Sequence, residues 1–381
     1  MSERRPGNYW PTHEQELLLR AALSEGPVAV EAWAVLRPFL DLDHMGRASE
    51  RLVPLLYQNL RRHGIDDPRL SRFKDIYRYT WSRNERLFRR GAMLLGDLGR
   101  AGVPTLLLKG AALVQACYGG DSGLRPMNDF DVAVPAANAL QAVAVLRAAG
   151  WVPRYEITPS FLRIKHAGVF ETGTGLYCDL HWHVFEECCR PSDDDDLWHA
   201  AAEIDFGGRR TRLLSRSDQL LHVCAHGAKW ADESGIRWIA DAALVLAGGA
   251  IDWSRIVEQA VRRRYVVRMR AALGFLRGRM AAPVPDFVLT ALAAAPVSRT
   301  ERFEARVLRR EHRLLGQLLL YWCHHRRAHD GGVVAAARSF PGYLREAWGL
   351  DMLRELPAGA LQRARRRLGR VLRGPGPDRH R

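Results

Sequence analysis

Two aspartates near residue 130 have the spacing of a metal-binding pair. Asp129 and Asp131 alternate with apolar residues and are followed by the apolar run at 132–134. This pattern predicts a buried strand, on which residues two apart point to the same face. Neighbouring carboxylates repel each other unless a cation neutralises them, and Mg²⁺ is the natural ion for such oxygen ligands. The alternative is an aspartate pair that caps a turn at the start of a strand and faces water.

A lysine and a glycine follow the apolar segment that precedes this pair. Residues 103–108 are a short apolar run, and residues 111–118 have the pattern of a helix. Free N–H groups at a helix N-terminus attract anions, and glycine lets a phosphate approach the backbone closely. Lys109, Gly110 and Ala111 are therefore candidates for a phosphate-binding turn. The alternative is an ordinary strand-to-helix turn with a solvated lysine.

A third polar segment follows some fifty residues later. Asp179, His181 and His183 alternate with Leu180 and Trp182, so a strand would place the acid and both imidazoles on one face. Such a face could bind a metal, or it could be a structural histidine pair beside one acid. Cysteines at 188 and 189 raise the question of zinc, but their spacing from the histidines matches no structural zinc pattern well.

The order of these segments resembles a known family. The Lys-Gly turn, Arg125, the Asp-x-Asp pair and the Asp-Leu-His-Trp sequence at 179–182 are similar to the uncharacterised nucleotidyltransferase family of the DNA-polymerase-beta-like superfamily. The resemblance extends to Asn84 and to the segments at 221–227 and 237–241. The fold it implies is of the α+β class, with a small mixed-sheet nucleotidyltransferase domain flanked by N-terminal and C-terminal helical regions.

The resemblance also implies a reaction. A nucleoside monophosphate would pass from an NTP to a hydroxyl or similar acceptor on a small molecule, a peptide or another macromolecule such as a protein or RNA, with release of pyrophosphate. Two Mg²⁺ ions, with Mn²⁺ as an alternative, would be held by three carboxylates. Asp129 and Asp131 would bridge both ions, and Asp179 would bind the catalytic ion and accept the proton of the acceptor.

The resemblance assigns the remaining residues to the nucleotide. Lys109, Gly110 and Ala111 would contact the triphosphate, Arg125 would neutralise a phosphate, and His181 would lie in the nucleotide-binding set. The usual Gly-Ser or Gly-Gly turn of the superfamily is here Gly110-Ala111, so this turn offers no serine hydroxyl.

Two other functions fit parts of the pattern. Nucleotide-sugar glycosyltransferases also use Asp-x-Asp with a divalent ion, but they place several strand–helix units before it, and here only one precedes. A non-catalytic module could instead use the helical flanks and a basic tail to bind RNA or a partner protein.

The elements that position these residues divide the chain into four parts. We expect an N-terminal helical region at 1–99, the α/β domain at 100–205, a C-terminal helical domain at 206–360 and a basic tail at 361–381. Strands are expected at 103–108, 129–134, 151–155, 166–170 and 176–183. Breaks in the C-terminal helices are expected near 248–249, 283–285, Pro296 and Pro341.

Three residues in the C-terminal region have no assigned role. His222 and His226 are four residues apart and share a helix face, so they either pack behind the site or line the nucleotide pocket. Asp241 has the same spacing from Arg237, which predicts that these two pair with each other.

Composition narrows the class of protein. The 381 residues carry a formal charge of +15, of which the tail contributes +7 from eight arginines and one aspartate. That tail could contact an acidic partner or be a solvated helix. The six cysteines are scattered, no apolar stretch has membrane-spanning length, and the charged first twenty residues predict no secretory signal. The expected location is the cytoplasm.

Overall fold

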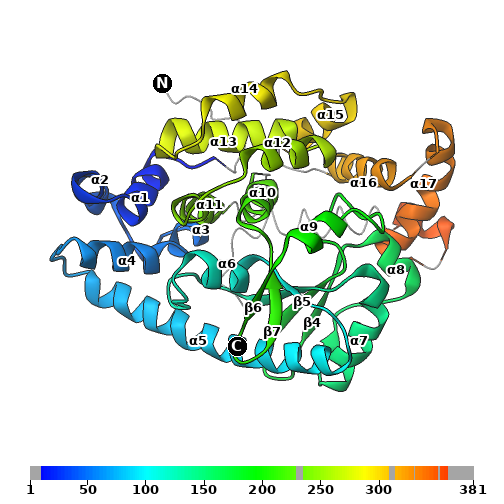
Figure 1. Cartoon of the computed structure of the whole chain (residues 1–381), viewed down its shortest axis with the longest axis horizontal. Helices are drawn as coiled ribbons and strands as arrows, with labels where there is room; N and C mark the ends of the chain where they lie inside the picture. Colours follow the sequence, from blue (N-terminus) through cyan, green and yellow to red (C-terminus); the bar gives the residue numbers. More distant parts are fainter. Residues whose placement is uncertain (1–9, 229–234, 309–313, 330, 351, 359–381) are drawn as a thin grey trace.

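Helices from both ends of the chain enclose one seven-stranded mixed sheet (Figure 1). The computed structural model describes residues 10–228, 235–308, 314–329, 331–350 and 352–358. This arrangement confirms the predicted mixed-sheet domain with helical regions on both sides. The basic tail at 361–381 lies outside the described residues.

The N-terminal region begins with a capped helix. The Thr12 hydroxyl accepts a hydrogen bond from the Gln15 N–H, and the Gln15 side chain accepts one from the Thr12 N–H. This reciprocal pair satisfies two of the N–H groups that a helix start leaves open. The helices of this region are α1 His13–Leu23, α2 Gly26–Leu36, η1 Arg37–Phe39, α3 Arg47–Glu50, α4 Val53–Arg62 and α5 Leu70–Arg100.

The sheet contains the five expected strands and two that the sequence did not reveal. Its order is β3-β4-β5-β2-β1-β7-β6, with β5 parallel to β2 and β1 parallel to β7. The last two strands form a hairpin whose turn coincides with the expected boundary at 205/206, so both sides of that boundary belong to the sheet. The strands are β1 Leu106–Leu107, β2 Asp129–Ala133, β3 Val152–Pro153, β4 Ala167–Glu171, β5 Tyr177–His181, β6 Ala202–Asp205 and β7 Arg210–Leu213.

The two faces of the sheet pack into different hydrophobic cores. Leu107, Phe130 and Val132 contribute to a core with α5 and with α7 Ala139–Ala148. Leu106 and Ala133 contribute to the other core, which the N-terminal and C-terminal helices share. Figure 1 shows α6 Lys109–Cys117 lying between the sheet and α11 Arg237–Ala247. Residues that alternate along a strand thus reach opposite sides of the molecule, which places Asp129 and Asp131 on the face opposite Phe130.

The C-terminal helices follow the sequence pattern with one exception. The breaks expected near 248–249, 283–285 and Pro296 separate consecutive helices. The prediction of a break at Pro341 was wrong, because α17 continues through this residue. The cost of the lost hydrogen bond is offset there by ring packing of Phe340 and Tyr343 on the preceding helix. These helices are α10 Arg216–Gly227, α11 Arg237–Ala247, α12 Trp253–Arg262, α13 Val266–Met280, α14 Asp286–Ala294, α15 Arg299–Val307, α16 Leu314–Ala328, α17 Val333–Trp348 and η3 Leu353–Glu355.

Short helices complete the connections within the α/β domain. They are η2 Ala136–Asn138, α8 Pro159–Ile164 and α9 Asp195–Ala200. Over the ranges given above, none of the helices has both the length and the apolar character needed to span a membrane.

Candidate active site

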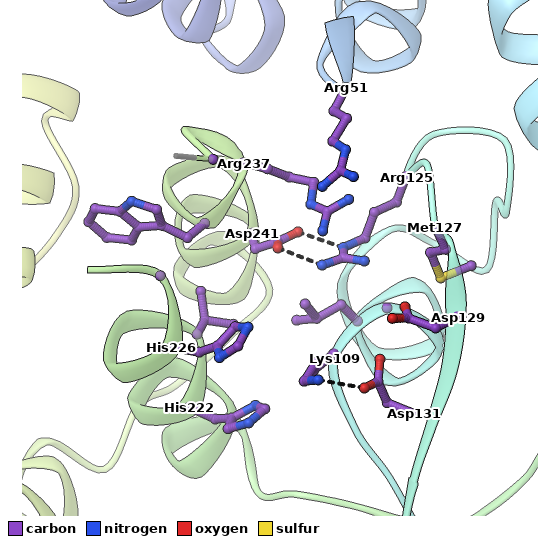
Figure 2. Close-up of a pocket in the computed structure, with 16 residues that line it drawn as sticks. Arg51, Lys109, Arg125, Met127, Asp129, Asp131, His222, His226, Arg237 and Asp241 are labelled. Carbon is purple, nitrogen blue, oxygen red and sulfur yellow. Dashed lines mark hydrogen bonds and ion pairs between the residues drawn. The ribbon is translucent and has the colours of Figure 1, made fainter. Parts of the chain in front are cut away.

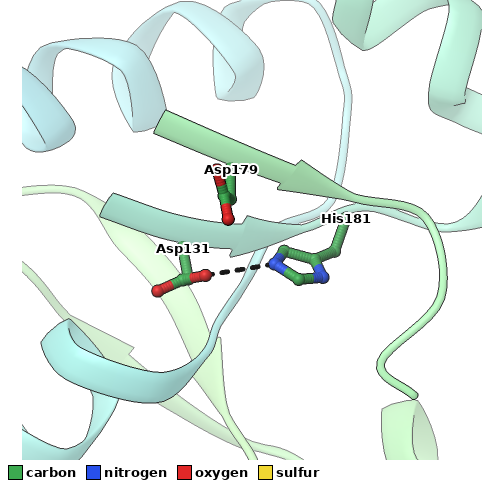
Figure 3. A group of neighbouring side chains, drawn as sticks. All are labelled: Asp131, Asp179 and His181. Atoms are coloured by element: carbon green, nitrogen blue, oxygen red, sulfur yellow. Dashed lines mark hydrogen bonds and ion pairs between the residues drawn. The ribbon is translucent and has the colours of Figure 1, made fainter. Parts of the chain in front are cut away.

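The segments that contain Asp131 and Asp179 meet at the centre of the sheet. Strands β2 and β5 are parallel neighbours, and their register places Asp131 directly opposite Asp179 (Figure 3). Ligand atoms of Asp131, Asp179 and His181 all lie within 4.8 Å of one another. Asp129 precedes them on β2 and lines the same cavity as Asp131. Asp131 is therefore close to Asp179 across the two strands and shares the cavity with Asp129.

Packing on the opposite face of β2 fixes where these carboxylates point. Phe130 is fully buried against α5, and an added Cβ on Gly91 of that helix would lie only 2.4 Å from its ring. The ring therefore occupies space that only glycine leaves open. Because side chains alternate along a strand, the anchored Phe130 turns Asp129 and Asp131 toward the cavity.

Lys109 reaches the carboxylates from the first position of α6, two residues after β1. The Leu108 N–H donates a hydrogen bond to the Asp131 carbonyl at 3.1 Å, which holds the next residue beside β2. The Lys109 Nζ lies 2.6 Å from Asp131 Oδ1 and 3.9 Å from Asp179 Oδ2. Lys109 also has a φ of 44°, in the left-handed region that non-glycine residues rarely adopt. Backbone strain of this kind is common at functional sites.

The carboxylates are crowded in a buried setting. Burial and repulsion from Asp131 raise the pKa of Asp129, and the same two causes raise the pKa of Asp179 to about 7. Burial disfavours the charge of Lys109, but attraction to the carboxylates outweighs it and raises the pKa of its ammonium. The donor set is rich in oxygen and bears more negative charge than Lys109 neutralises. Its chemistry therefore fits a hard divalent cation such as Mg²⁺.

His181 lies behind Asp131 and is 1% exposed. Its Nε2 is 3.1 Å from Asp131 Oδ1, and burial holds its pKa well below the usual range, so the ring is neutral. We assign the proton to Nε2, because a carboxylate oxygen can only accept. His183 does not join this group; its Nδ1 lies 3.2 Å from Asp194 Oδ2. The expected face of one acid and two imidazoles thus contributes two of its three members.

A cavity of about 240 Å³ opens in front of Asp129 and Asp131 (Figure 2). Its walls come from the sheet, the start of α6, helices α10 and α11, and the residue after α3. The lining residues are Arg51, Lys109, Gly110, Leu113, Arg125, Met127, Asp129, Asp131, His222, Val223, His226, Gly227, Gly235, Arg237, Trp238 and Asp241.

The turn at the start of α6 lies in this cavity wall. No side chain caps the first turn of α6, so its N-terminal N–H groups are oriented as in an anion site. An added Cβ on Gly110 would lie 2.3 Å from Met127 Sδ and 2.8 Å from Arg125 Nη1. A side chain at 110 would therefore displace Met127 or Arg125, while Ala111 is buried next to Gly110.

Arg125 is held in place by the C-terminal helices. Its Nε and Nη2 donate to the two oxygens of Asp241, each at 2.8 Å, and the Tyr118 hydroxyl donates to the same carboxylate at 2.6 Å. The partner of Asp241 is therefore Arg125 rather than the expected Arg237, whose Nη1 donates to the Pro126 carbonyl at 2.6 Å. A tight link thus joins the α/β domain to α11.

The two histidines of α10 lie on the cavity wall. The rings of His222 and His226 stack with their centroids 6.1 Å apart. Burial, with the nearby Lys109 charge, lowers the pKa of His222 to about 3, so this ring is neutral. It can contribute a hydrogen bond or a stacking surface, but not a charge.

Two further residues contribute to the site, and only one of them, Asn84, carried a signal in the sequence. Arg51 reaches the cavity from the N-terminal helices, and nothing in the local pattern around it distinguishes it from other surface arginines. Asn84 is fully buried on α5, where its Nδ2 donates to the carbonyls of Ser122 and Arg125 at 2.6 and 2.9 Å. Asn84 thereby fixes the loop that carries Arg125 and Met127.

The chain matches one family model, and it is distantly similar to several solved structures. A family model described as "Uncharacterised nucleotidyltransferase" matches residues 47–278. No curated protein matches the chain. The solution structure of the antibiotic-resistance factor ANT(2'')-Ia aligns at 15% identity and a TM-score of 0.34, over 50% of this chain and 95% of that one. The crystal structure of an antigenic nucleotidyltransferase-like protein from Paracoccidioides brasiliensis aligns at 14% identity and a TM-score of 0.35, over 56% of this chain and 95% of that one.

Proposed function

Because the chain belongs to the family of uncharacterised nucleotidyltransferases, we propose that it transfers a nucleoside monophosphate from an NTP to an acceptor hydroxyl and releases pyrophosphate. The observation that carries this proposal is the in-register pair of Asp131 and Asp179. Asp131 lines a cavity together with Lys109 and the start of α6, and Lys109 Nζ lies 3.9 Å from Asp179 Oδ2. Carboxylates beside an anion-binding turn are what phosphoryl transfer requires, since its catalysis consists of positioning and charge stabilisation.

Asp129, Asp131 and Asp179 would hold Mg²⁺, in the two-ion arrangement of the superfamily, with Mn²⁺ as a substitute. Bound there, the ions would stabilise charge on the attacking and leaving oxygens. Asp131 would be the central ligand, because it is buried and lies between Lys109 and His181. His181 acts as a positioning residue, since its Nε2–H fixes the orientation of one Asp131 oxygen.

The chain's own groups account for the remaining steps. Lys109 and the N–H groups of Gly110 and Ala111 bind phosphate oxygens at the start of α6, while Arg125 adds positive charge beside them. The acceptor oxygen attacks the α-phosphorus, and the bond from that phosphorus to the oxygen bridging to the β-phosphate breaks, with its electron pair leaving on pyrophosphate. Asp179 takes the proton of the acceptor. Its raised pKa suits it to hold a proton near neutral pH.

Pyrophosphate release tests this function. Purified protein is supplied with each of the four NTPs, Mg²⁺ and a metabolite extract of the source cells as the pool of acceptors. We expect pyrophosphate to form with one or more NTPs and Asp131→Asn to abolish it. Asp75→Asn, which makes the same change at an exposed position of α5, should leave it unchanged. Release of nucleoside diphosphate without pyrophosphate would reject the proposal, because the bond to the γ-phosphate would then be the one that breaks.

A further inference from the structure

One wall of the cavity carries guanidinium groups from three regions that are far apart in the sequence. Arg51 follows α3, Arg125 lies in the loop before β2, and Arg237 begins α11. Figure 2 shows Lys109 and Asp131 at one end of the group and Arg51 at the other. The cavity therefore has an acidic end, where the carboxylates lie, and a basic end whose role the carboxylates do not explain.

Among the described residues that line the basic end, three are arginines and one, Asp241, is an acid. Both oxygens of Asp241 are occupied by Arg125, and the hydrogen bond of Arg237 goes to a neutral carbonyl, that of Pro126. Burial and the nearby charges of Arg125 and Arg51 lower the pKa of Arg237 to about 10, despite attraction to Asp241. An anion in this part of the cavity would relieve that repulsion.

The basic end adjoins the phosphate-binding turn. The Arg125 guanidinium lies against Gly110, as the 2.8 Å contact of an added Cβ shows, so it borders the first turn of α6. A ligand that places one phosphate at Lys109 and extends along the cavity would next meet Arg125 and then Arg237 and Arg51. Guanidinium groups suit such a ligand because their forked N–H groups match phosphate oxygens.

We propose that Arg51 and Arg237 form a second phosphate subsite, which binds the terminal phosphates of the donor nucleotide. Arg125 backs this subsite and is kept rigid by Asp241. The inference rests on the proposed function, because it takes the α-phosphate to lie at the carboxylates. It makes the N-terminal and C-terminal helices part of donor recognition, and it makes the site select donors by the number of their phosphates.

Binding of inorganic tripolyphosphate tests the subsite without any reaction. Its dissociation constant is measured by calorimetry on the full chain in the presence of a metal chelator. We expect Arg51→Gln and Arg237→Gln each to weaken binding by about 10-fold or more, because each removes a charge-assisted contact. Arg86→Gln, on the exposed side of α5, makes the same change of charge and should alter binding less than about twofold. Arg237→Lys keeps the charge and replaces Arg237→Gln if that variant does not fold; it should lose less affinity than Arg51→Gln.

Competition identifies the source of the phosphates. Nucleoside triphosphates should displace tripolyphosphate, and the corresponding monophosphates should not. Unchanged tripolyphosphate binding in Arg51→Gln, or triphosphates that bind without displacing it, would overturn the inference. The outcomes for binding and for transfer separate this inference from the proposed function. If the wild-type protein binds tripolyphosphate through Arg51 and Arg237 but transfers no nucleotide, the subsite stands and the reaction is rejected.

Discussion

Gly91 of α5 packs against Phe130 of β2, the strand that carries Asp129 and Asp131. Gly91→Ala should therefore reduce both stability and nucleotidyl transfer. An added Cβ would lie 2.4 Å from Phe130 Cε2 and 2.6 Å from Cζ. Normal carbon–carbon contacts are about 3.5 Å or longer, so the ring would have to move by about 1 Å. Phe130 is fully buried and sits between Asp129 and Asp131, so that movement would pass to the carboxylates.

The magnitude follows from comparison with a second glycine of the same helix. Gly99 has nothing within 4 Å of an added Cβ, so Gly99→Ala should gain only the helix preference for alanine, about 0.5–1 kcal/mol. Gly91→Ala receives the same gain but adds an overpacking cost of about 1–3 kcal/mol. The two variants should therefore differ in free energy of unfolding by about 1–3 kcal/mol, with Gly91→Ala the less stable.

Denaturant unfolding of both variants and of the wild type measures this difference. Pyrophosphate release, measured on folded protein, should fall in Gly91→Ala by about 10-fold or more, since misplacement of a reacting group by about 1 Å can cost 100-fold. Gly99→Ala should be as active as the wild type. The reasoning fails if Gly91→Ala is as stable as Gly99→Ala, or if it retains full activity.

Three further changes probe single contacts of the site. In chelator, Asp179→Asn should be more stable than the wild type at pH 8, by up to about 4 kcal/mol, because the pKa of Asp179 is about 7 when folded and near 3.8 when unfolded. The free energy of unfolding of the wild type falls as pH rises from about 4 to 7, because folding then requires a buried charge at Asp179. Thermal unfolding should therefore show the difference in stability between the two proteins shrinking toward pH 4. His181→Ala should lower kcat by more than it changes KM for the nucleotide, since the ring contacts Asp131 rather than the cavity; an effect confined to KM would contradict that role. Tyr118→Phe removes the hydroxyl that Asp241 accepts from and should cost about 1 kcal/mol of stability in urea unfolding; no loss would mean that the Arg125 pair suffices alone.

The carboxylate pair could be predicted because its cause is local. The alternation of acids with apolar residues at 129–134 already requires one buried face and one polar face, and the parallel register of β2 and β5 only brings Asp179 to its place. The turn at Lys109 was predictable for the same reason, since an apolar run, a glycine and a helix pattern lie next to one another in the sequence.

The basic end of the cavity could not be predicted because its cause is not local. Arg51 and Arg237 lie 186 residues apart and meet only because both sets of helices pack on α6 and the sheet. The same limit explains the wrong partner for Asp241: spacing along α11 favoured Arg237, but the loop fixed by Asn84 delivers Arg125 to it. Strands β6 and β7 were missed because their exposed edge carries polar and charged residues that do not alternate clearly with apolar ones.

The fate of each phosphate of the donor shows directly whether a nucleoside monophosphate is transferred and pyrophosphate released. The NTP that supports pyrophosphate release is supplied with label either at the α-phosphate or at the γ-phosphate, together with Mg²⁺ and the acceptor pool. Nucleotidyl transfer should attach the α label to the acceptor and release the γ label in pyrophosphate. Neither outcome is expected in Asp131→Asn. Transfer of the γ label to the acceptor, or release of the α label in a nucleoside diphosphate, would show that a different bond is broken and would contradict the account.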